Sequence, residues 1–198
     1  MQRRTLLLTA AAAIAMGQAA KADPISLDRL NAYFNGFTTA SGDFTQYNSD
    51  GSTSTGTLYL QRPGRARFEY NGSDALVMAG GGQVAVFDGR SNVEPQQFPL
   101  NRTPLGLILA RNVDLSRSRM VFGHQEVEGR TLVQARDPKQ PEIGHIDLYF
   151  LPDPVRLDQW TITDETGART AVVLKGLQTG ANLPSTLFNI PIEQEKRR

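Results

Sequence analysis

Short runs that alternate apolar and polar residues dominate the chain after residue 40 and predict β-strands. Gly, Asp, Asn and Pro residues separate these runs, and the connections are short, so neighbouring strands are expected to pair as antiparallel hairpins. A flat sheet of about eleven strands is unusual, so the pattern indicates a closed barrel or a strongly curled sheet. The predicted strands are Ser41–Asn48, Thr53–Arg62, Ala66–Tyr70, Asp74–Ala79, Gln83–Asp88, Asn92–Gln97, Arg119–Glu126, Arg130–Arg136, His145–Leu151, Val155–Thr163 and Arg169–Lys175.

A helix is predicted before the first strand, from Ser26 to Asn35. Ser26 can cap its start, and Asp28 suits its first turn. One apolar stripe and a closing glycine complete the pattern: Leu27, Leu30, Phe34 and Gly36.

A second, shorter helix is predicted at Thr103–Ala110, with Thr103 as its cap and Pro104 at its first position. Its apolar residues do not form a single stripe, because Leu107 points away from the face that Leu105, Ile108 and Leu109 share. Such a helix must be covered on more than one side. It is therefore either a buried core helix or a helix with one side against a bound apolar ligand.

The alternation around Pro63-Gly64 predicts the register of one hairpin. A two-residue loop would place leucines opposite charged residues. A three-residue loop, Pro63 to Arg65, instead pairs Leu60 with Phe68 and Leu58 with Tyr70, which separates an apolar face from a polar face. Arg62 then falls on the apolar face at its rim. Its guanidinium either finds acceptors there, such as carbonyls at a helix end, or turns into water.

Residues 1–22 have the pattern of a secretory signal peptide. Arg3 and Arg4 precede an apolar run, and Ala20-Lys21-Ala22 offers a small-x-small cleavage site. We therefore expect a single domain at residues 23–198, exported to the periplasm by the Sec route or, given the paired arginines, by the twin-arginine route. The chain has no cysteine, so neither a lipid anchor nor a disulfide is expected.

Charge and composition argue against several classes of function. The formal net charge is +1, and the predicted signal holds three of the cations and no acid, so the remainder is near −2 and no nucleic-acid partner is expected. The run Lys196-Arg197-Arg198 is expected to be a solvated tail.

Motifs for catalysis or for a cofactor are also missing. His124 and His145 lack metal-ligand spacing, Gly80-Gly81-Gly82 predicts a hairpin turn, and no GxSxG occurs, so we expect no metal, no cofactor and no enzyme. Acids such as Asp147 and Asp158 are expected to be solvated. A carboxylate pair formed from them would leave an exported hydrolase as an alternative.

Several short motifs occur in a distinctive order. They are Phe44-Thr45-Gln46, the segment Gly56 to Tyr70 around Arg62-Pro63-Gly64, Val84-x-Val86-Phe87-Asp88, Pro99 to Leu109 around Thr103-Pro104, and Asp164-x-x-Gly167-x-x-Thr170. Together they resemble the periplasmic outer-membrane lipoprotein carrier family of LolA type, over nearly the whole chain after the signal. The chain departs from this family at Ala85, where an aromatic is frequent, and at its short C-terminal end.

The resemblance implies a mainly β fold, an unclosed barrel of eleven antiparallel strands with an α-helical lid over an apolar cavity for acyl chains. The helix at Thr103–Ala110 would belong to the lid, and Arg62 would hydrogen-bond lid backbone in the closed form. The implied lipid-binding and lid-binding residues are Leu58, Leu60, Arg62, Phe68, Leu105, Leu107, Ile108 and Leu109.

The implied function is that of a soluble periplasmic chaperone that carries lipoproteins from the inner to the outer membrane. Its implied partners are acylated lipoproteins, an inner-membrane lipoprotein-releasing ABC transporter, and an outer-membrane receptor or the acceptor membrane, with the carrier itself a monomer. One alternative is a lipoprotein-sensing or lipid-sensing regulatory domain of the same fold, which would usually carry a second domain. The exported hydrolase is the other.

Overall fold

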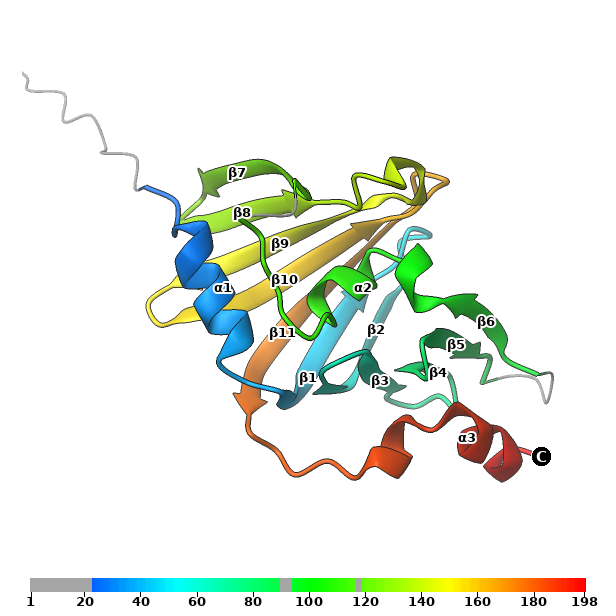
Figure 1. The fold of residues 1–198 in the computed structure, drawn as a ribbon. Helices are drawn as coiled ribbons and strands as arrows, with labels where there is room; N and C mark the ends of the chain where they lie inside the picture. The colour runs from blue at the N-terminus through cyan, green and yellow to red at the C-terminus, as the bar shows by residue number, and fades with distance from the viewer. Residues whose placement is uncertain (1–22, 90–93, 117–118) are drawn as a thin grey trace, which may run out of the picture.

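A single curled antiparallel sheet forms the body of the protein (Figure 1). The computed structural model describes residues 23–89, 94–116 and 119–198, so the predicted signal peptide lies outside the described residues. The strand order is β6-β5-β4-β3-β2-β1-β11-β10-β9-β8-β7, and every pair is antiparallel. Because β6 and β7 are the two edges, the barrel is unclosed, as the family resemblance implies.

The described residues contain eleven strands. They are β1 (Thr39–Tyr47), β2 (Thr53–Gln61), β3 (Arg65–Tyr70), β4 (Leu76–Gly80), β5 (Gln83–Phe87), β6 (Gln96–Pro99), β7 (Val121–Val127), β8 (Arg130–Ala135), β9 (His145–Pro152), β10 (Val155–Thr163) and β11 (Arg169–Thr179). The helical segments are α1 (Leu27–Asn35), η1 (Leu100–Arg102), α2 (Leu105–Ile108), η2 (Pro141–Ile143), η3 (Ser185–Phe188) and α3 (Ile190–Lys196).

Most of the strand predictions are confirmed, and β6 is the clearest difference. It runs over Gln96–Pro99, later in the chain than the predicted Asn92–Gln97, and residues 92 and 93 lie outside the described part. The cross-strand pair of Val84 with Phe98 places two apolar side chains opposite each other. This pairing places β6 later in the chain than the predicted strand, which began at the polar Asn92.

The first helix forms as predicted. The Ser26 hydroxyl accepts a hydrogen bond from the Arg29 amide, and the Gly36 amide closes the last turn on the Tyr33 carbonyl. Leu30 and Phe34 are buried against the sheet. Figure 1 shows α1 lying across the same side of the sheet that α2 covers.

The hairpin between β2 and β3 has a three-residue loop, but the predicted register is wrong by two residues. Leu58 pairs with Phe68 and Leu60 with Ala66, so the loop consists of residues 62–64. Gly64 adopts a φ of 73°, a conformation that glycine accepts without steric cost, and this centres the turn one residue earlier. A shift of two leaves each side chain on its face, so the predicted apolar face is retained.

The second helix is shorter than predicted, and Thr103 is not its cap. Pro104 occupies the N-cap position, and the Thr103 hydroxyl donates instead to the Leu100 carbonyl at 2.9 Å. Thr103 is extended, with a ψ of 142°, because the residue before a proline is excluded from the helical region. The helix therefore starts only after Pro104.

A third helix, which the sequence analysis did not predict, packs on the opposite face of the sheet. The Asn189 side chain caps α3, because its Oδ1 accepts a hydrogen bond from the Ile192 amide at 3.0 Å. A separate small apolar cluster joins the helix to β4 and β5: Leu76, Met78, Ala85, Phe87 and Ile190.

The expectation of a solvated C-terminal tail is wrong for Arg197. Its side chain bonds Glu193 at 2.8 Å and the Asp74 carbonyl at 2.6 Å. These contacts help to hold α3 against the sheet.

Candidate functional site

The concave face of the sheet carries the main apolar cluster of the protein. Alternate residues of the strands point into it, and α1 and α2 cover it. Phe44 on β1 lies 5.6 Å from Phe68 on β3, measured between ring centroids, and Phe68 lies 6.2 Å from Trp160 on β10. Phe34 of α1 meets Phe150 of β9 edge-on at 5.6 Å. Aromatic rings therefore occupy both the floor and the cover of this interior.

Beneath α1 and α2, the described side chains are closely packed. They enclose a cavity of about 10 Å³, about the room that one water molecule needs. An engineered cavity that takes up benzene has about 150 Å³. A long acyl chain can therefore enter this cavity only if the residues that line it move. The cavity is lined by Phe34, Phe37, Leu58, Leu60, Arg62, Ile108, Leu157, Trp160, Leu174 and Leu177.

Arg62 lies at the rim of this interior and contacts the C-terminal end of α1. Its Nη2 donates to the carbonyls of Phe34 and Phe37, and its guanidinium carbon lies 4.9 Å from the centroid of the Phe37 ring. Of the two possibilities for Arg62, the structure shows the hydrogen-bonded one. Carbonyls at a helix end carry partial negative charge, which suits a cation.

The contacts of Arg62 are incomplete. Within the described residues, no acceptor lies within hydrogen-bonding distance of its buried Nε and Nη1. Burial lowers the pKa of Arg62, and the nearby Tyr33 hydroxyl opposes this only in part. The arginine is therefore held at α1 at a substantial desolvation cost.

Backbone contacts of the β2–β3 hairpin also fix the end of α2 and the segment that joins α1 to β1. The Gly64 amide of the β2–β3 loop donates to the Leu109 carbonyl at the end of α2, at 2.8 Å. The Arg62 amide donates to the Thr38 carbonyl at 2.7 Å. One hairpin therefore contacts both the end of α1 and the end of α2.

The residues predicted from the sequence fall into three groups. Leu58, Leu60, Arg62 and Ile108 line the cavity. Phe68, Leu105 and Leu109 are buried in the same cluster without bordering the cavity, and Leu107 is partly buried against it. Leu107 and Leu109 also border an outer groove of about 680 Å³ beside α2.

Sequence reasoning missed six lining residues: Phe34, Phe37, Leu157, Trp160, Leu174 and Leu177. Phe34 was predicted as buried, but its place beside Arg62 depends on tertiary packing. Leu157 and Trp160 are three residues apart, and so are Leu174 and Leu177. The pairing of β10 with β9 shifts after Leu157, and that of β11 with β1 shifts beyond Lys175. These bulges place residues three apart on one face, which strict alternation does not predict.

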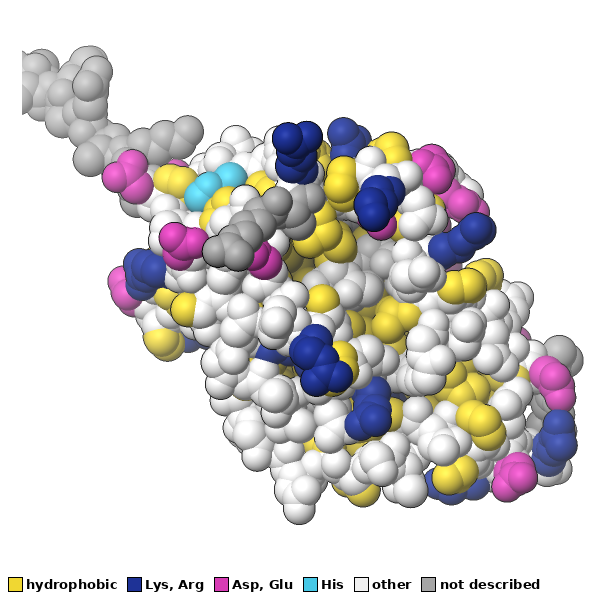
Figure 2. Space-filling view, viewed as in Figure 1, with side chains coloured by type: hydrophobic (Ala, Val, Ile, Leu, Met, Phe, Trp, Pro, Cys, Tyr) yellow, Lys and Arg dark blue, Asp and Glu magenta, His cyan; other side chains and the backbone are white. Residues whose placement is uncertain are grey.

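The apolar interior reaches the surface at one edge of the sheet. Val86 on β5 and Phe98 on β6 are 38% and 47% exposed. Figure 2 shows hydrophobic side chains gathered over the β4–β6 end of this face and in its hollow centre.

The acids considered for a hydrolytic pair engage different partners. Asp147 is buried, contrary to expectation, and accepts a hydrogen bond from Gln134 at 3.0 Å. Asp158 lies 3.5 Å from Arg130. Among residues 23–89, 94–116 and 119–198, no group of three or more metal-binding side chains occurs, and no helix has the length and apolar character needed to span a membrane.

Comparison with known proteins gives a consistent result. The family model described as outer membrane lipoprotein carrier protein LolA matches residues 35–191. An outer-membrane lipoprotein carrier protein from Chromohalobacter salexigens is 25% identical over 94% of this chain and 92% of its own length. One from Chromobacterium violaceum is 29% identical over 90% of this chain and 89% of its own length.

A solved structure shows a similar fold. It is a domain from Vibrio parahaemolyticus described as a candidate outer membrane lipoprotein-sorting protein. It has a TM-score of 0.50 and 10% identity, and the match covers 85% of this chain and 97% of that one.

Proposed function

The chain belongs to the LolA family of outer membrane lipoprotein carrier proteins, and we propose that it is a periplasmic chaperone that carries lipoproteins from the inner to the outer membrane. It shields their acyl chains and catalyses no reaction. One observation carries this proposal: an apolar concave face lies beneath two helices whose ends are held by a single buried arginine and its hairpin.

Transfer energetics explain why a lipoprotein needs such a carrier. Burial of one methylene contributes about 0.8 kcal/mol, so an acyl chain of about 16 carbons contributes on the order of 12 kcal/mol. A protein with such chains does not leave a membrane for water unaided. The concave face supplies the apolar surface: Leu58, Leu60 and Phe68 form part of its floor, and Leu105, Leu107, Ile108 and Leu109 contribute to the cover.

Delivery to an acceptor requires that the carrier does not bind lipid too strongly. Competition from the closed, lipid-free state limits the strength of that binding. We define the lid as α1, α2 and residues 111–116, which contact α1. When the lid closes, Arg62 gains its two carbonyl acceptors, and lipid binding must give them up. Because only open molecules bind lipid, the apparent association constant is the intrinsic one multiplied by the fraction of molecules that are open. Arg62 is thus proposed as the latch that favours release.

The proposed partners follow from the transport direction. A lipoprotein-releasing ABC transporter of the inner membrane would load the carrier, and an outer-membrane receptor or the acceptor membrane would unload it. The carrier would act as a monomer, after export by the predicted signal peptide.

A release assay tests this function. The purified protein is added to spheroplasts that hold an acylated lipoprotein, and the soluble fraction is probed for a one-to-one complex. Formation of that complex is the expected result. If nothing is released while a matched donor transporter is present, the carrier function is wrong. Mass spectrometry of lipid extracted from the protein would then identify the cargo of a lipid sensor.

A further inference from the structure

A stretch of the chain without acidic residues runs from the edge strand β6 to just beyond the end of α2. Between Glu94 and Asp114 the sequence holds two arginines and no aspartate or glutamate. Arg102 ends η1 and Arg111 follows α2, and both side chains are exposed. Within the described part of the chain, neither arginine has a hydrogen-bond or ion-pair partner. Both charges are therefore available to an anion outside the protein.

Apolar side chains reach the surface along the same stretch. Phe98 of β6 is 47% exposed, and Leu107 of α2 is only partly buried. Leu107 borders the outer groove of about 680 Å³, which is also lined by the turns at Pro63-Gly64 and Gly81-Gly82. Because these turn residues have no long side chain, they leave the outer side of α2 accessible to a broad, flat partner.

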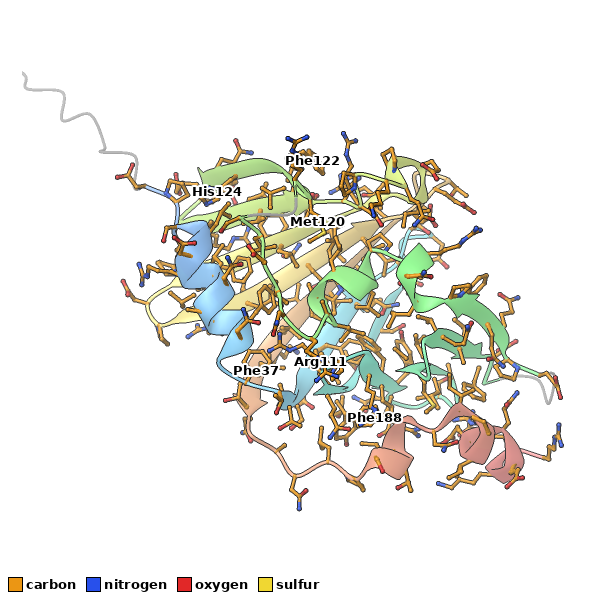
Figure 3. All side chains as sticks on the ribbon, in the orientation of Figure 1. Phe37, Arg111, Met120, Phe122, His124 and Phe188 are labelled. Atoms are coloured by element: carbon orange, nitrogen blue, oxygen red, sulfur yellow. The ribbon has the colours of Figure 1, made fainter. Side chains whose placement is uncertain are left out.

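Acidic side chains are scarce around α2. Figure 2 shows Lys and Arg side chains beside hydrophobic ones at the centre of this face, and most acidic side chains towards its margin. Figure 3 shows Arg111 just beyond the end of α2 on the same face. The acid that lines the groove is Asp137, whose carboxylate accepts the backbone amide of Lys139 at 2.8 Å. Since residues 23–198 have a net charge near −2, the excess of cations is local, and it would orient the protein towards an anionic surface.

A phospholipid bilayer has the chemistry that complements this surface. Its anionic headgroups attract arginines, and the boundary between headgroups and acyl chains accepts exposed apolar side chains. We propose that Phe98, Arg102, Leu107 and Arg111 form a docking patch by which the carrier binds the surface of an anionic phospholipid bilayer. The proposal rests on the carrier function for its purpose. Because α2 covers the apolar concave face, docking through α2 would bring that face to the membrane that receives the cargo.

Co-sedimentation of the cargo-free protein with lipid vesicles tests the docking patch. One set of vesicles contains equal parts of phosphatidylglycerol and phosphatidylcholine, and the other contains phosphatidylcholine alone. The protein should bind the first set and not the second, and its binding should weaken as the salt concentration rises, since salt screens exposed charges. Equal binding to both sets, or binding to neither, would overturn the proposal.

Removal of the two arginines locates the contact. Each contributes about fivefold to binding at an anionic surface, so Arg102→Gln/Arg111→Gln should bind the phosphatidylglycerol vesicles about 25-fold more weakly than the wild type. The matched control is Arg156→Gln/Lys175→Gln, which removes the same charge from exposed positions of β10 and β11 and should bind within about twofold of the wild type. If both double variants weaken equally, or if neither weakens, the patch is not the docking site.

A fluorescent label reports the contact directly. The chain has no cysteine, so Asn112→Cys places a single environment-sensitive fluorophore at an exposed position beside Arg111. Its emission should increase and shift to shorter wavelength on the phosphatidylglycerol vesicles, while the same label at Lys175→Cys should not respond. A response at position 175 but not at position 112 would place the docking surface elsewhere and refute the proposal.

These measurements use no lipoprotein, so they separate failure of the patch from failure of the carrier function. If the patch binds vesicles as expected but the protein releases no lipoprotein from spheroplasts, the proposed patch is correct and the carrier function is wrong. If release is normal but vesicle binding does not depend on Arg102 and Arg111, the carrier function stands and the patch is wrong.

Discussion

Replacement of Arg62 by leucine is expected to strengthen lipid binding and to slow release. The arginine makes two charge-assisted hydrogen bonds to α1, each worth about 1.5–3 kcal/mol. Its Nε and Nη1 are buried without an acceptor in the described structure, at a cost of about 1–3 kcal/mol each. The two bonds together supply about 3–6 kcal/mol and the two unmet donors cost about 2–6 kcal/mol, so the net contribution to lid closure is at most about 4 kcal/mol, and the latch requires a value of about 1–3 kcal/mol within that range. Loss of that amount raises the apparent affinity for lipid by about 5-fold to 150-fold.

The assay follows a fluorescent acyl probe from the protein to acceptor vesicles, together with the dissociation constant of the probe. Arg62→Leu should bind more tightly and transfer more slowly than the wild type. Arg65→Leu is the matched control, because Arg65 is an exposed neighbour that bonds only Gln61 within the described residues. If Arg62→Leu binds and transfers like the wild type, the latch mechanism is refuted.

Two further predictions concern stability. The Glu193 carboxylate bonds Arg67 and Arg197, so Glu193→Gln should lower the free energy of unfolding by about 1–3 kcal/mol near neutral pH. Burial alone would raise the pKa of Glu193, but the hydrogen bonds from Arg197 and Arg67 outweigh it and hold the pKa below the ordinary 4.5. The folded pKa is thus the lower one, so the stabilisation is complete above about pH 4.5 and is lost as the pH falls below it. Urea unfolding of both proteins at about pH 7 and about pH 3 should show the difference shrinking on acidification, and a constant difference would contradict the ion-pair origin. Gly56→Ala should destabilise by about 1–3 kcal/mol in the same measurement, because its Cβ would meet the Glu69 carbonyl oxygen at 1.9 Å, and wild-type stability would show that the backbones can separate.

The strands and their inward faces could be predicted because alternation is a local property of the sequence. The same property explains the error in the β2–β3 register. Pairing Leu58 with Phe68 or with Tyr70 gives the same separation of faces, since the pattern repeats every two residues. The observed register goes with a loop in which Gly64 has a φ of 73°. The inner position of Arg62, by contrast, is the same in both, and it was predicted correctly.

The remaining parts of the site depend on contacts between distant segments. Phe34 and Phe37 follow no pattern that identifies them as acceptors of an arginine, because only the packing of α1 places them there. The cap of α3, by contrast, has a local signal, because Asn189 before Ile190-Pro191 is a recognisable helix start.

The latch and the apolar interior should be separable by varying the length of the acyl chain. Since the closed cavity is only about 10 Å³, the space for each added methylene is created by lid movement, and each contributes about 0.8 kcal/mol, or about fourfold in affinity. Opening of the lid, by contrast, costs the same free energy for a chain of any length. A plot of the logarithm of affinity against chain length should therefore give parallel lines for the wild type and Arg62→Leu, displaced by the contribution of the latch. Lines of different slope would show that Arg62 acts on the bound lipid itself rather than through the lid.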